Sequence, residues 1–114
     1  MSLREQIESG LFKEAKKGAL DLPPDELETL LIECSYDSSN MCFYLFIQYL
    51  IFEKNTADLQ SIAATLLIIS YPHINGAYSL AYKHMKLAND LAPQDPSYKE
   101  GLGFFSDIPD DVID

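Results

Sequence analysis

The stretch LAYKHMKLANDLAPQDPSYKE, residues 80–100, decides the fold prediction for this chain of 114 residues. Its first part predicts a helix over about residues 77–91. Pro93 ends that helix, because a proline lacks the amide hydrogen that a helix interior requires. Asp95 can cap a following helix that has Pro96 at its first position. The stretch therefore predicts two consecutive helices joined by a short turn.

Small and bulky residues follow one another along the first of these helices at defined intervals. Ala81, Met85, Ala88 and Pro93 are separated by four, three and five residues. This spacing resembles the second helix of tetratricopeptide repeats. The alanines let neighbouring helices approach closely, and the bulky residue fills the gap between them. The signature of the first helix is missing upstream, so the resemblance covers about residues 77–100 and implies a tetratricopeptide-like architecture rather than a true repeat array.

The rest of the chain carries helix start and stop signals and no strand signals. Gly10 and Gly18 are expected to divide an amphipathic stretch at residues 3–20 into two short helices. A helix with an acidic first turn is expected to open at Pro23 and Pro24. Its predicted inward stripe consists of Leu27, Leu30, Leu31 and Cys34. The further predicted helices span about residues 40–54, capped by Ser38 or Ser39, 57–70, capped by Thr56, and 96–105.

These helices lead to one fold prediction. The length of the chain allows one domain with one core. We predict an all-α single domain over residues 1–114, built as a compact, tetratricopeptide-like stack of antiparallel helix pairs with six or seven short helices. Residues 41–52 and 59–71 are apolar nearly all round, so other helices should cover this central pair on most sides. An acidic tail is expected from about residue 106.

Charge narrows the possible partners. Eighteen acidic residues against eight basic ones give a net charge of -10. Residues 1–37 carry nine acidic and four basic side chains, and residues 90–114 carry seven and one. Repulsion disfavours direct binding of nucleic acid or of an anionic membrane surface. No apolar run reaches the roughly 20 residues of a membrane helix. We therefore expect a cytoplasmic protein whose natural partner is a basic protein.

No motif points to catalysis. Cys34 and Cys42 match neither a C-x-x-C motif nor a zinc spacing, and are expected to be free, buried thiols. His73 and His84 belong to no metal motif, and His84 is expected on a solvated helix face next to lysines. Residues 101–105, GLGFF, contain only two of the three glycines of a dinucleotide-binding loop, and no predicted strand precedes them. We predict no enzymatic activity, no metal and no cofactor.

A second resemblance reaches further along the chain. The segment GAYSLAYKHMKLANDLAPQDPSYKEGLGFFSDIP, within about residues 74–109, resembles the C-terminal part of small helical immunity proteins from bacterial contact-dependent inhibition and polymorphic toxin systems. The resemblance implies a protein that binds and blocks the toxic C-terminal domain of a cognate effector, an RNase or DNase. The charge agrees independently, because a nuclease cleft is basic and carboxylates can occupy it in place of phosphates.

Two groups of residues are the candidates for that contact. The first lies where a helix is expected to end and expose its side chains, and the second is too acidic to be buried. The predicted partner-binding residues are Glu33, Tyr36 and Asp37 in the first group and Asp107, Asp110 and Asp111 in the second.

Two other interpretations remain open. An acidic surface also keeps a protein soluble without binding anything. A tetratricopeptide-like adaptor or chaperone that holds a peptide is the main alternative function. The grooves of such adaptors usually carry Lys, Arg or Asn side chains to hold the peptide, and the basic residues of this chain are few and scattered.

Overall fold

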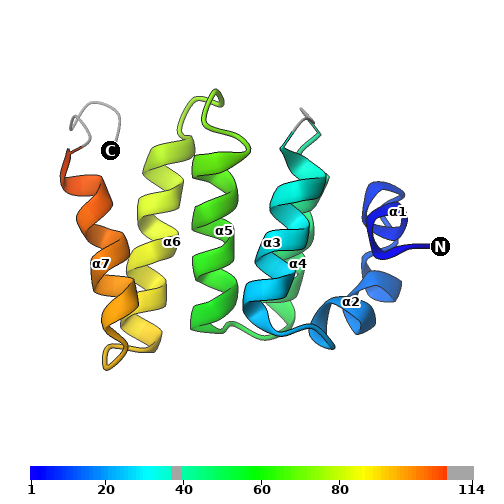
Figure 1. Ribbon diagram of the computed structural model, residues 1–114, viewed down its shortest axis with the longest axis horizontal. Coiled ribbons are helices and arrows are strands. Elements are labelled where there is room, and N and C mark those ends of the chain that lie inside the picture. The colour runs from blue at the N-terminus through cyan, green and yellow to red at the C-terminus, as the bar shows by residue number, and fades with distance from the viewer. Residues whose placement is uncertain (37–39, 108–114) are drawn as a thin grey trace.

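The computed structural model describes residues 1–36 and 40–107, and every regular element in these ranges is a helix (Figure 1). From α3 to α7, each helix runs in the opposite direction to the one before it in Figure 1, so consecutive helices are antiparallel. The predicted all-α stack of six or seven short helices is confirmed for the described residues. The elements are α1 (Leu3–Glu8), α2 (Phe12–Leu20), α3 (Pro24–Ser35), α4 (Cys42–Glu53), α5 (Ala57–Ile69), α6 (Ala77–Leu91), α7 (Pro96–Phe104) and the short 3-10 helix η1 (Phe105–Asp107).

The helices begin where the sequence places caps. The Thr56 hydroxyl accepts the Leu59 amide hydrogen at 3.2 Å, and α5 starts at the next residue. The Asp95 carboxylate accepts the Ser97 amide hydrogen at 3.0 Å, with Pro96 at the first helical position. Each cap satisfies an amide that the first turn of a helix leaves without a partner. The Ser38 or Ser39 cap predicted for α4 falls outside the described residues.

The two N-terminal glycines behave differently from each other. Gly10 has φ of 75°, in the left-handed region that favours glycine, and separates α1 from α2 as predicted. Gly18 was expected to break the helix as well, and this prediction is wrong, because Gly18 lies inside α2. A glycine in right-handed helical conformation costs about 1 kcal/mol relative to alanine, which packing elsewhere in the helix can offset.

The packing of α6 follows the spacing that the tetratricopeptide-like pattern describes. Ala81 and Ala88 are fully buried, and Met85 is buried beside them. Met85 fills the space towards α7, where a Cβ added at Gly101 would lie 2.9 Å from the methionine sulfur. The small residues therefore permit close approach, and the methionine occupies the gap between α6 and α7.

The central pair is less covered than its composition suggests. α5 packs against α3, α4 and α6. On α4, Leu45 is 54% exposed and Phe52 is 88% exposed. The expectation that residues 41–52 are covered on most sides is therefore wrong for the outer face of α4. The remaining apolar side chains of α4 pack into the single cluster of buried residues that extends from α1 to η1.

A chain of buried polar side chains joins α4, α5 and α6. The Nδ1–H group of His84 donates to the Gln60 amide oxygen at 2.6 Å, because that oxygen can only accept. The Tyr44 hydroxyl lies 2.7 Å from Nε2 of His84 and donates to it. The Gln48 amide donates to the same hydroxyl, and the Gln60 amide donates to Asn55 Oδ1 at 2.9 Å. Each ring nitrogen of the imidazole therefore has a partner on another helix.

The expectation that His84 lies on a solvated face is wrong. The side chain is 6% exposed and points towards α4 and α5 rather than towards the neighbouring lysines. Burial lowers the pKa of the His84 imidazole from 6.5 to about 4. The ring is neutral at pH 7, with its proton on Nδ1 and its lone pair on Nε2, which matches the donor and acceptor around it.

We expect His84 to make the fold sensitive to acid between about pH 6.5 and pH 4. In this window the unfolded chain binds a proton at His84 that the folded chain does not, so the free energy of unfolding falls as the pH falls. The slope from this one group is at most about 1.4 kcal/mol per pH unit. Urea unfolding at several pH values should show a shallower dependence for His84→Gln than for the natural chain. Parallel profiles for the two proteins would contradict the assignment.

We expect replacement of two glycines by alanine to change the free energy of unfolding in opposite directions. Gly18→Ala should raise the free energy of unfolding by about 0.5–1 kcal/mol, because the site is helical and the added Cβ makes an ordinary 3.9 Å contact with Leu3. Gly76→Ala should lower it by about 1–2 kcal/mol, because Gly76 has φ of 88° before α6. Thermal unfolding measures both, with Gly76→Asn as the control that tolerates the left-handed conformation.

Candidate protein-binding surface

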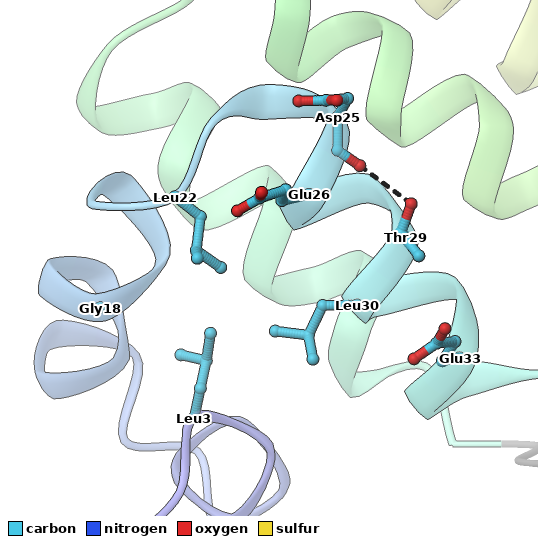
Figure 2. A pocket seen from close by; sticks show the side chains of 8 residues that line it. All are labelled: Leu3, Gly18, Leu22, Asp25, Glu26, Thr29, Leu30 and Glu33. Carbon is cyan, nitrogen blue, oxygen red and sulfur yellow. Dashed lines mark hydrogen bonds between the residues drawn. The ribbon is translucent and has the colours of Figure 1, made fainter.

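An open groove runs along the outer face of α3, opposite α1 and α2 (Figure 2). Its volume is about 590 Å³. Leu3 of α1, Leu22 of the α2–α3 connection and Leu30 of α3 point towards one another across it (Figure 2). These three side chains pack only partly against the core. They form an apolar floor that solvent can reach.

Acidic side chains of α3 line the same groove. Asp25, Glu26 and Glu33 are exposed and belong to its lining. Thr29 lies among them, and its hydroxyl donates to the Asp25 carbonyl oxygen at 3.0 Å (Figure 2). Among the described residues that line the groove there is no Lys, Arg or His. The groove therefore combines an apolar floor with a rim of one charge sign.

A second, smaller hollow continues the acidic surface. It has a volume of about 350 Å³, and Asp25 lines both this hollow and the groove. Asp25 and Glu28 come from α3, Asp58 from α5 and Asp95 from the start of α7. The N-termini of these three helices all lie along the lower edge of the molecule in Figure 1. The positive ends of the helix dipoles stabilise carboxylates there, which offsets part of their mutual repulsion.

The pKa values of several side chains that line the hollow are shifted. Burial and, to a smaller extent, the nearby Asp25 raise the pKa of Glu28. The Tyr98 hydroxyl donates to the Asp58 carboxylate at 3.2 Å, and burial together with this negative charge raises the pKa of Tyr98 to about 12. Hydrogen bonds from Ser97 lower the pKa of Asp95. The hollow thus gathers several carboxylates, and the described residues that line it include no basic side chain.

A third cavity, of about 560 Å³, lies between α2, the start of α3, the end of α4 and the start of α5. Its interior is apolar, and its lining includes Lys16, Glu53, Lys54 and Asp58. Lys16 and Glu53 form an ion pair at 3.5 Å. Since two cations and two carboxylates surround it, this cavity selects no charge sign in a partner.

The structure places one of the predicted partner-binding residues in the lining of the acidic surface. Glu33 lines the groove, and Tyr36 follows at the C-terminal end of α3, where it is 65% exposed. Asp107 is the last residue of η1. Asp37, Asp110 and Asp111 lie outside the described residues. No contact with a partner has been observed for any of the six, so their role stays a prediction.

Sequence reasoning missed most of the groove. The acidic residues after Pro24 were interpreted as favourable charges at a helix start, and Asp25 and Glu26 do lie in the first turn of α3. Leu30 was expected in the inward stripe, and it is only half-buried because it faces the groove. The spacing of Glu26, Leu30 and Glu33 places them on one helix face and could have indicated the groove.

Other kinds of site are absent from the described ranges. Residues 1–36 and 40–107 contain no group of three or more His, Cys, Asp and Glu residues that could hold a metal ion. No helix there has the length and apolar content needed to cross a bilayer. Cys34 and Cys42 are free and buried, as predicted. His73 is exposed in the turn before α6.

Comparison with known proteins identifies no relative. No family model, curated protein or solved structure matches this chain. A functional proposal therefore rests on the chain's own residues.

We expect Glu28→Gln to stabilise the protein at pH 7. Burial raises the pKa of this carboxyl group, so its ionised form disfavours the folded state above that pKa. Removing the charge should raise the melting temperature by a few degrees at pH 7, and the gain should disappear below about pH 4, where the glutamate is protonated in both states. Glu100→Gln on the exposed face of α7 is the matched control. An equal gain at every pH would contradict the explanation.

Proposed function

We propose that this chain is an immunity protein that binds the basic C-terminal domain of a cognate toxin and covers its substrate cleft. The observation that carries the proposal is the continuous acidic surface made by the α3 groove and the adjoining hollow, which share Asp25. In this proposal the toxin domain is a nuclease, an RNase or DNase. The chain acts in the cytoplasm by binding, without catalysis or a cofactor and without contacting nucleic acid itself.

Electrostatics supports this mode of action. A nuclease holds its substrate through positive charge in the cleft, and a surface of opposite sign is attracted to that cleft over about a Debye length. Carboxylates on rigid helices occupy the positions of substrate phosphates. Competition with the substrate then depends on the positions of these carboxylates as well as on the total charge.

The apolar floor of the groove adds what charge alone does not provide. Burying leucine side chains on binding contributes about 25 cal/mol for each Å² removed from water, and it depends weakly on salt. Leu3, Leu22 and Leu30 provide such surface next to the carboxylates. An inhibitor needs this short-range contribution in order to remain bound after long-range attraction has brought the two proteins together.

The peptide adaptor is supported less well by the same surface. Among the described residues, the linings of the groove and the hollow contain no Lys, Arg or Asn to hold a peptide carboxylate or backbone. A basic partner fits this surface better than a peptide that ends in a free carboxylate.

The decisive test is co-expression with the toxin domain encoded next to this chain. We expect growth to be rescued and a one-to-one complex to co-purify. Normal toxicity together with no complex would refute the proposal.

Charge reversal should then weaken the complex. Glu26→Lys combined with Glu33→Lys reverses two exposed charges of the groove. We expect slower association and a flatter dependence of the affinity on salt, with unchanged helical content by circular dichroism. Asp90→Lys, at the exposed C-terminal turn of α6, is the matched control, because a cation there suits the helix dipole. If the double variant binds like the natural chain, another surface makes the contact.

A further inference from the structure

The chemistry of the groove identifies the kind of segment that enters it. We infer that the groove between α1 and α3 receives one amphipathic helix of the partner, which places an apolar side chain between two basic residues. This inference rests on the proposed inhibitory function and deepens it, because it specifies which feature of the toxin domain is held.

The apolar centre of the groove is the first part of the argument. Leu3, Leu22 and Leu30 come from three segments of the chain and converge on one open space of about 590 Å³ (Figure 2). No side chain among the described residues covers their exposed surface, so a side chain of a partner can remove it from water. A leucine, isoleucine or methionine of the partner has the required shape and polarity.

The charges on the rim are the second part. Glu26 and Glu33 lie on either side of Leu30 along α3. Seven residues of a helix correspond to a rise of about 10 Å. The groove therefore presents an acidic group, an apolar group and an acidic group in a line, and its complement is basic, apolar and basic over the same distance.

The third part is the backbone conformation of that complement. On a helix, residues i, i+4 and i+7 lie on one face, so a helix can present all three groups to α3 at once. In a strand, about 10 Å corresponds to three residues, and side chains three apart point to opposite faces. The distance between the acidic groups therefore selects a helix over an extended segment.

Other surfaces of the molecule specify a partner less well. The cavity beside Lys16 has a rim of mixed charge, and the exposed outer face of α4 with Leu45 and Phe52 has nothing next to it that specifies a partner. Arg4, the cation on α1, forms an ion pair with Glu8 at 3.5 Å and is not part of the groove lining.

Binding of a synthetic helical peptide tests the chemistry directly. The probe is a labelled, alanine-based peptide of about 16 residues, long enough to form a helix, with Lys, Leu and Lys at positions i, i+4 and i+7. Fluorescence anisotropy measures its affinity for the full chain. We expect saturable binding that weakens about tenfold or more when Leu is replaced by Ser or when both Lys are replaced by Glu.

A variant that fills the groove tests the location. Gly18 lines the groove from α2, and a Cβ there lies 3.9 Å from Leu3 Cδ1. Gly18→Leu should cover the leucine floor while it changes no charge and improves helix propensity. We expect at least about tenfold weaker peptide binding. Gly103→Leu, at an exposed α7 site with no atom within 4 Å of an added Cβ, should bind the peptide as the natural chain does.

The outcomes separate the two proposals. The inference is overturned if the natural chain binds the Lys peptide no better than the Glu peptide, or if Gly18→Leu binds the Lys peptide undiminished. If Gly18→Leu still rescues cells from the toxin while the double charge variant does not, the acidic rim makes the contact without an apolar side chain in the groove. The inferred inserted helix is then wrong, and the inhibitory function stands. If the peptide binds at the groove but no toxin is neutralised, the proposed function fails instead.

Discussion

The positions of α4, α5 and α6 depend on one buried imidazole. His84 can be buried only if both of its ring nitrogens find partners, and these partners come from two other helices. Leaving a buried polar group unsatisfied costs about 1–3 kcal/mol, so a shift of α4 or α5 relative to α6 would be penalised at several atoms at once. Apolar contacts alone specify the arrangement less sharply, because cores that keep their volume and pattern tolerate repacking.

Polar contacts also connect this centre to the helix that carries the acidic face. The hydroxyls of Ser35, at the end of α3, and Ser70, just after α5, are both buried and lie 2.7 Å apart. Tyr71, which is fully buried, donates its hydroxyl hydrogen to the Asn40 carbonyl oxygen at 2.8 Å. The serine pair holds the end of α3 against the end of α5, and the Tyr71 bond holds the segment just before α4 at the same place. The outer face of α3 is therefore presented by a helix whose inner side is fixed, as a rigid binding surface requires.

Most of the charge on α3 is kept apart from its buried side. The buried positions of this helix are Leu27, Leu31, Cys34 and Ser35, three of its four acidic residues are exposed, and Glu28 is half-buried. The N-termini of α3, α5 and α7 lie along the same edge of the molecule and lower the cost of gathering four carboxylates there. The result is a surface of one sign with apolar floor residues beside it, which combines long-range attraction with short-range burial. The proposed inhibitor function uses both properties.

The sequence by itself determined the helices and many of their ends. Pro24, Thr56, Asp95 and Pro96 act within one turn of their own position, so their effects could be predicted from neighbouring residues. Only the tertiary structure decided that His84 is buried, that Gly18 stays helical and that Leu30 faces a groove. These outcomes depend on which helix lies opposite each residue, at separations such as the 40 residues between Tyr44 and His84. A pattern of local propensities contains no information about that pairing, because burial and hydrogen-bond partners arise only when distant segments pack together.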